Sequence, residues 1–129
     1  GRRYIDCLFS IGRDWIVSQR FVDALAGFKT AAGVRFVPVT LTGTKQPIPY
    51  FAVAAARIDA LDRERSQIEY YRSVPDSIKQ INQLVLNPSV LQDLEWLITR
   101  ENDFIVSDSV LSSFRRHELV GLQYLPVGV

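Results

Sequence analysis

One dense polar cluster holds the residue types that acid–base or metal-dependent chemistry requires. Its members are Arg57, Asp59, Asp62, Arg63, Glu64, Arg65 and Ser66. Paired carboxylates at this spacing can exchange protons with a substrate or bind magnesium. The pattern is equally typical of a surface turn with Asp caps and exposed ion pairs, each worth about 0–1 kcal/mol. We favour the turn and keep as an alternative a small metal-dependent hydrolase using Asp59, Asp62 and Glu64.

Other nucleophiles, bases and metal ligands are sparse. His117 is the single histidine and stands in a charged run typical of a solvated helix end. The lone Cys7 lies in an apolar run, which predicts a buried and unreactive thiol, and one cysteine and one distant histidine cannot form a zinc site. Ser18 and Ser107 fit helix caps better than nucleophiles. We therefore expect no catalytic residue, no cofactor, no bound metal and no enzymatic activity.

Length and composition predict one soluble domain. The chain has 129 residues, 47% of them hydrophobic, and a net charge of +1. This length is sufficient to bury a core, and the mixed charges favour neither nucleic acid nor an anionic membrane as partner. A single cysteine cannot form an internal disulfide, which favours a reducing compartment. We expect a single domain spanning residues 1–129 in the cytoplasm, and the absence of methionine suggests that a segment precedes Gly1.

A stretch that occurs twice organises the chain. Residues 7–18 match residues 96–107 at an offset of 89, and residues 33–39 match residues 121–127 at an offset of 88. The identical pairs are Leu8/Leu97, Asp14/Asp103, Ile16/Ile105, Val17/Val106, Ser18/Ser107, Gly33/Gly121, Pro38/Pro126 and Val39/Val127. Self-similarity of this kind indicates a duplicated supersecondary unit inside one domain.

The duplicated unit is predicted to be strand–turn–strand–helix–strand in both residues 7–39 and residues 96–127. In the first copy, aromatic and β-branched residues predict strands at 4–9, 14–17 and 34–39, with a helix after Ser18. Pro38 favours a sheet edge, because it has no amide hydrogen. The second copy has Ser107 as the helix cap and a closing strand at residues 121–127. Trp15 and Phe104 should occupy equivalent core or half-buried positions.

The segment between the copies is less regular. The alanine-rich residues 53–61 have helix propensity, whereas residues 50–53 and 68–71 favour strands, so both assignments stay open. We expect a strand at residues 81–86 and a short helix capped by Asn87. The whole pattern predicts a strand-rich α+β fold.

The same middle segment is the best candidate for contact with another protein. It places Arg63, Arg65, Tyr70 and Tyr71 close together in sequence, and arginine and tyrosine are the residues that interfaces favour as anchors. It also has no counterpart in the repeat, so the scaffold does not require it. The alternative is a solvated hairpin with partly packed tyrosines.

Several short motifs follow one another in a characteristic order. They are Ile-Val-Ser before each predicted helix, Gly-Val-Arg-Phe-Val-Pro-Val at residues 33–39, Ile58-Asp59-Ala60-Leu61-Asp62 followed by Ser66, Leu84-Val85-Leu86, and Gly-Leu-Gln-Tyr-Leu-Pro-Val at residues 121–127. This order resembles the immunity-protein 11 family of bacterial polymorphic toxin systems. The resemblance spans residues 4–127. It implies a cytoplasmic protein that neutralises a cognate toxin or effector protein by binding it, with no catalytic residues. A self-associating scaffold is a further alternative.

Overall fold

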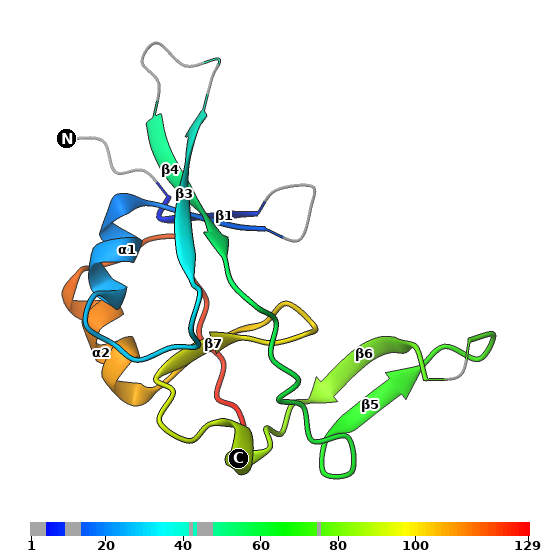
Figure 1. Cartoon of the computed structure of the whole chain (residues 1–129). Coiled ribbons are helices and arrows are strands. Elements are labelled where there is room, and N and C mark those ends of the chain that lie inside the picture. The colour runs from blue at the N-terminus through cyan, green and yellow to red at the C-terminus, as the bar shows by residue number, and fades with distance from the viewer. Residues whose placement is uncertain (1–4, 10–13, 42, 44–47, 75) are drawn as a thin grey trace.

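The N-terminal half of the chain forms an antiparallel four-stranded sheet. In the computed structural model, which describes residues 5–9, 14–41, 43, 48–74 and 76–129, the strand order is β1-β2-β4-β3 (Figure 1). The strands are β1 (Cys7–Phe9), β2 (Trp15–Val17), β3 (Arg35–Leu41) and β4 (Ile48–Ala54). β3 lies at an edge of this sheet, as Pro38 predicts. A residue without an amide hydrogen cannot donate to the hydrogen-bond ladder, and an edge strand tolerates that loss better than a central one.

The second half of the chain contributes two hairpins and a second helix. β5 (Gln67–Tyr70) pairs with β6 (Ile78–Gln83), and β7 (Trp96–Ile98) pairs with β8 (Phe104–Val106). The helices α1 (Gln19–Leu25) and α2 (Asp108–Arg116) follow β2 and β8, and the short 3-10 helix η1 (Pro88–Val90) precedes β7. The predicted α+β class is therefore confirmed.

Both α-helices begin at the serines predicted to cap them. The Ser18 hydroxyl accepts a hydrogen bond from the Phe21 amide at 3.1 Å, and the Ser107 hydroxyl accepts one from the Val110 amide at 3.3 Å. Each oxygen satisfies a first-turn N–H that has no partner within the helix. Asn87 caps η1 as expected, since its side chain accepts from the Ser89 amide at 3.1 Å.

The two hairpins of the predicted repeat pair in the same register. Every paired position in β7–β8 lies 89 residues after its counterpart in β1–β2. Two contacts also join equivalent positions of the copies. Trp15 and Phe104, both half-buried, pack edge to face with ring centroids 5.2 Å apart, and the Ser113 hydroxyl donates to the carbonyl of Ala24 at 2.7 Å. The second contact holds α1 against α2 beside the sheet (Figure 1).

The closing strand of the repeat is present only in the first copy. Residues 122–127 form no strand, and only Gly128 makes a β-bridge there, with Val85. The strand predicted at residues 121–127 is therefore wrong, and the four-element repeat is not confirmed. The physical reason is a missing neighbour, because β3 pairs with β4 whereas no described strand pairs with residues 121–127. The equivalent glycines Gly33 and Gly121 still share a left-handed backbone, with φ of +84° and +88°.

Between the copies, tertiary packing rather than helix propensity determines the local structure. The alanine-rich residues 53–61 contain the end of β4 and then isolated bridges, from Ile58 to Thr99 and from Leu61 to Leu86. The intervening Ala60 is fully buried, so packing against the second half of the chain outweighs a weak local preference. The strand expected at residues 81–86 is also shifted, because β6 occupies residues 78–83 and only isolated bridges follow it.

The β7–β8 hairpin lies between two parts of the core. Successive side chains of a strand point to opposite faces, and in β7 both faces are covered. Trp96 and Ile98 pack with Phe21 and Phe114 from the two helices, whereas Leu97 packs with a second group around Leu86. All three β7 side chains are buried as a result. Both copies of the repeat thus meet around this hairpin.

The buried carboxylate of Asp6 accepts hydrogen bonds from the start of α1 and from the segment that follows α2. Asp6 accepts from the Ser18 hydroxyl at 2.7 Å, from the Val120 amide at 2.6 Å and from the Arg20 guanidinium at 2.9 Å. Arg20 also donates to the carbonyl of Glu118 at 2.8 Å. Burial by itself would raise the pKa of Asp6, but these hydrogen bonds and the arginine charge outweigh it and hold the pKa below its ordinary value.

The two cap serines should differ in their contribution to stability. We expect Ser107→Ala to lower the free energy of unfolding by about 1 kcal/mol, the usual cost of a lost cap. Ser18→Ala should cost about 2–3 kcal/mol, because it removes a cap and also a hydrogen bond to the ionised Asp6. Chemical denaturation measures both, with the exposed Ser112→Ala as the control. Equal losses at the two caps would contradict this role of Ser18.

Candidate functional site

The three carboxylates considered for catalysis or metal binding do not converge on one site. Asp62 accepts from the amides of Glu64 and Arg65, both at 3.1 Å, and its other oxygen lies 2.7 Å from the Arg65 Nε. Asp59 lies 3.6 Å from Arg100, with both side chains more than half exposed. Glu64 is exposed. Within the described ranges, no three histidine, cysteine or acidic residues lie close enough together to hold a metal ion.

The remaining reactive side chains are also placed for structure. Cys7 is buried, and burial, reinforced by the negative charge of Asp6, raises the pKa of its thiol to about 12. The thiolate, which is the reactive form, is therefore scarce at neutral pH, as the sequence predicted. His117 caps the end of α2, where its ring nitrogen Nδ1 lies 2.9 Å from the carbonyl oxygen of Ser113.

The β5–β6 hairpin projects from the rest of the molecule as an arm (Figure 1). Its outer half exposes Tyr70, Tyr71 and Val74, with exposed fractions of 40%, 49% and 53%. Side chains this exposed bury limited area against the rest of the protein, so they contribute limited stability to the scaffold. Apolar side chains grouped on a protruding element are typical of a contact surface.

The two arginines of the predicted contact surface lie at the base of this arm, in the turn before β5. Arg65 binds Asp62 and also donates to the carbonyl of Leu86 at 3.2 Å, so it holds the arm against the body. Arg63 is exposed in the same turn. The structure therefore places Arg63 and Arg65 at one end of β5 and Tyr70 and Tyr71 at the other, and it gives Arg65 a structural role.

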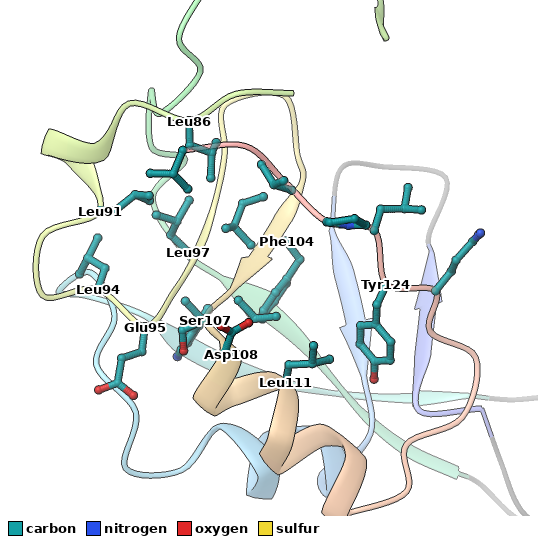
Figure 2. Close-up of a pocket in the computed structure, with 18 of the residues that line it drawn as sticks. Leu86, Leu91, Leu94, Glu95, Leu97, Phe104, Ser107, Asp108, Leu111 and Tyr124 are labelled. Carbon is teal, nitrogen blue, oxygen red and sulfur yellow. The ribbon is translucent and has the colours of Figure 1, made fainter. Parts of the chain in front are cut away.

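A groove that the sequence did not predict runs along β8. It encloses about 720 Å³ between β8, α2 and residues 123–127 (Figure 2). Leu111 from α2 and Tyr124 from the C-terminal segment lie across from Phe104, while Leu91, Leu94 and Leu97 close one end. A second hollow of about 850 Å³ continues from β8 to β6 of the arm.

The groove has one visible sequence signal. The C-terminal segment ends in apolar residues that stay exposed, with exposed fractions of 74% for Leu125 and 62% for Val129. The strand predicted at residues 121–127 placed Leu125 in a sheet, so its exposure was not expected. In the part of the chain that the structure describes, no helix is long and apolar enough to cross a membrane.

Comparison with known proteins identifies one family. A family model described as an immunity protein family, Imm11, matches residues 6–129, which is nearly the whole chain. No curated protein sequence matches the chain. The family match covers the four-stranded sheet, the arm and the groove together.

Proposed function

The chain belongs to the Imm11 immunity protein family, and we propose that it neutralises a bacterial toxin by binding it directly in the cytoplasm of the cell that produces both. The family match is the observation that carries this proposal. An immunity protein protects when its complex with the toxin is stable, so a rigid scaffold with an exposed contact surface is sufficient and no catalytic step is needed.

The arm supports binding as the mechanism. Its exposed tyrosines supply large, semi-rigid contact area of the kind that dominates protein interfaces. The exposed Arg63 at its base adds a charge that can steer association or pair with a carboxylate of the toxin. We propose that Arg63, Arg65, Tyr70 and Tyr71 lie in the interface, with Arg65 acting mainly by holding the arm in place.

Neutralisation tests the proposed function directly. We expect a large secreted protein with a toxic C-terminal domain to be encoded beside this chain's gene, and that domain is the probe. Bacteria that produce this domain alone should stop growing, and bacteria that also produce this chain should grow normally. The two purified proteins should elute as one complex in size-exclusion chromatography. Growth arrest that persists with soluble, folded chain present would overturn the proposal.

The arm residues should then act as binding hot spots. We expect Tyr70→Ala, Tyr71→Ala and Arg63→Ala each to raise the Kd for the toxin domain by fivefold or more, about 1 kcal/mol or above, with little change in stability. The exposed Arg116→Ala at the end of α2 is the matched control for Arg63. Calorimetric titration measures Kd, and thermal denaturation reports folding.

Arg65→Ala needs separate interpretation. It should lower stability as well as affinity, because it removes the bonds to Asp62 and to the Leu86 carbonyl. If the other three variants all bind the toxin domain within about 0.5 kcal/mol of the parent, below the scale of a hot spot, the arm is not the interface.

A further inference from the structure

β8 lacks a neighbour that its counterpart in the first copy has. β2 lies between β1 and β4, whereas β8, its equivalent 89 residues later, pairs with β7 alone among the described strands. In the first copy β4 runs antiparallel to β2, with Phe51 opposite Val17, and β3 follows beyond β4. No described strand lies at the corresponding position on the outer side of β8.

The backbone of β8 is oriented to pair on that side. The Ser107 amide donates to the Glu95 carbonyl at 2.8 Å, and the Thr99 amide donates to the Asp103 carbonyl at 2.9 Å. Hydrogen-bonded and non-hydrogen-bonded pairs alternate along an antiparallel ladder. Phe104 and Val106 are the β8 residues next to these hydrogen-bonded pairs, so each forms a non-hydrogen-bonded pair with β7. Their N–H and C=O groups therefore point away from β7.

These outward groups of Phe104 and Val106 have no hydrogen-bond partner among the residues that the structure describes. The outer edge of β7 is different. There the Ile58 amide donates to the Ile98 carbonyl at 2.9 Å, and the Trp96 amide donates to the Lys29 carbonyl at 3.3 Å. The described chain itself thus pairs with one edge of the hairpin, and none of the described residues pairs with the other.

The groove of about 720 Å³ lies on this open edge, and its far wall is formed by residues 123–127 (Figure 2). Residues 121–127 are the sequence counterpart of residues 33–39, which contain most of β3, and in the first copy β3 is separated from β2 by β4. The groove therefore occupies the position that β4 fills in the first copy. Its size lies within the range of sites that bind ligands.

We propose that this groove is a vacant strand position that accepts an extended segment of the toxin, antiparallel to β8. The inference rests on the proposed function and specifies how the partner binds. Addition of a strand to an exposed sheet edge is an established mode of recognition, in which backbone hydrogen bonds provide affinity and side-chain pockets provide specificity. The inserted segment would give the second copy the same strand arrangement as the first.

We assign the occupant to the toxin rather than to a strand from a second copy of this chain. Each described strand is already paired within the four-stranded sheet or one of the two hairpins. Donating one of them would break native pairing in the donor. The second hollow of about 850 Å³ connects β8 with β6 of the arm, so one partner can contact the arm and insert a segment beside β8.

The walls of the groove define the chemistry of the inserted segment. Leu94, Leu111 and Leu125 line it, and Glu95 and Asp108 stand with Arg115 among the polar residues. An apolar residue at alternate positions matches these walls. The strand that fills the equivalent position in the first copy, Ile-Pro-Tyr-Phe-Ala-Val-Ala, is itself apolar.

Residue-resolved amide hydrogen exchange tests the insertion without altering the chain. In the free protein the Phe104 and Val106 amides should exchange rapidly, whereas the Ile105 amide, which faces β7, should be protected. Saturation with the purified toxin domain should slow exchange at Phe104 and Val106 by tenfold or more. Ile105 serves as the internal control because its partner in β7 is present in both states.

A variant at the groove provides the second measurement. Leu125→Asp should raise the Kd for the toxin domain by tenfold or more, because it places a charge in the apolar wall. The matched control is Val37→Asp on β3, a valine with an exposed fraction of 42% far from β8 in sequence. Both side chains are exposed, and thermal denaturation checks that both variants stay folded.

Each outcome decides the inference. Complex formation with protection at Phe104 and Val106 and weaker binding of Leu125→Asp supports it. Complex formation without that protection overturns the insertion and leaves the proposed function standing. Failure of the toxin domain to bind at all overturns both. Concentration-dependent protection of the two amides in the chain alone would assign the edge to self-association and overturn the assignment to the toxin.

Discussion

Trp96→Ala is expected to lower the free energy of unfolding by about 3–5 kcal/mol, the range typical of large aromatic truncations in a core. The Trp96 side chain is 3% exposed and stacks on Phe104 with ring planes 5° apart and centroids separated by 5.1 Å. Phe104 in turn contacts Phe21 and Trp15. Removing the Trp96 indole leaves a cavity where the helices α1 and α2 meet the β1–β2 and β7–β8 hairpins. These elements cannot all move to fill it.

Urea denaturation measures the Trp96→Ala effect, and Trp15→Ala is its comparison. Trp15 is only half-buried, so its truncation should cost less, about 2–3 kcal/mol including its indole hydrogen bond to the Asn102 carbonyl. Phe104→Ala combined with Trp96→Ala should cost less than the sum of the single changes, because each removes part of the other's packing. A loss below about 1 kcal/mol for Trp96→Ala would contradict its burial.

Asp6→Asn is expected to cost about 2–4 kcal/mol at pH 7. Asparagine preserves the shape but loses the charge that Arg20 pairs with and cannot accept from Ser18, Val120 and Arg20 as the carboxylate does. Removing one partner of a buried pair costs about 3–5 kcal/mol when the other charge stays buried. The Arg20 side chain is 41% exposed and can reach water, so we expect the smaller cost of about 2–4 kcal/mol for Asp6→Asn.

The cost of Asp6→Asn should depend on pH in a defined direction. The pKa of Asp6 is lowered in the folded protein, so the carboxylate contributes its full stabilisation above its ordinary pKa of 3.8. This contribution is lost as pH falls through the lower folded-state pKa. The difference in unfolding free energy between parent and variant should therefore be constant near neutral pH and shrink at acidic pH. A difference that grows below pH 4 would assign the opposite shift to Asp6.

The sequence and the structure agree where short-range geometry decides. Ser18 and Ser107 were recognisable as caps because a hydroxyl and a free amide three residues later are all that a cap requires. The paired hairpins were predictable from alternating β-branched and aromatic residues within a few positions. The resemblance to immunity proteins, carried by short motifs in a fixed order, was confirmed by a family match over residues 6–129.

The positions of the proposed contact residues in the fold could be predicted only in part. The exposure of Tyr70 and Tyr71 follows from a segment that the repeat does not use. That Arg65 would instead bind Asp62 and the Leu86 carbonyl was not predictable, because Leu86 lies 21 residues away and reaches Arg65 only through the fold. The groove was missed because a strand pattern at residues 121–127 says nothing about whether a neighbouring strand exists.

By itself the sequence determined the caps, the hairpins, the α+β class and the family, since these depend on residues near one another in the chain or on their order. Only the tertiary structure decided which strand lies beside which, where the Asp6 carboxylate finds its partners and which edge stays open. The same Gly-x-x-x-x-Pro-Val pattern forms β3 in one copy and no strand in the other. A strand is stabilised by a neighbour that pairs with its backbone, and the presence of that neighbour is a property of the whole fold.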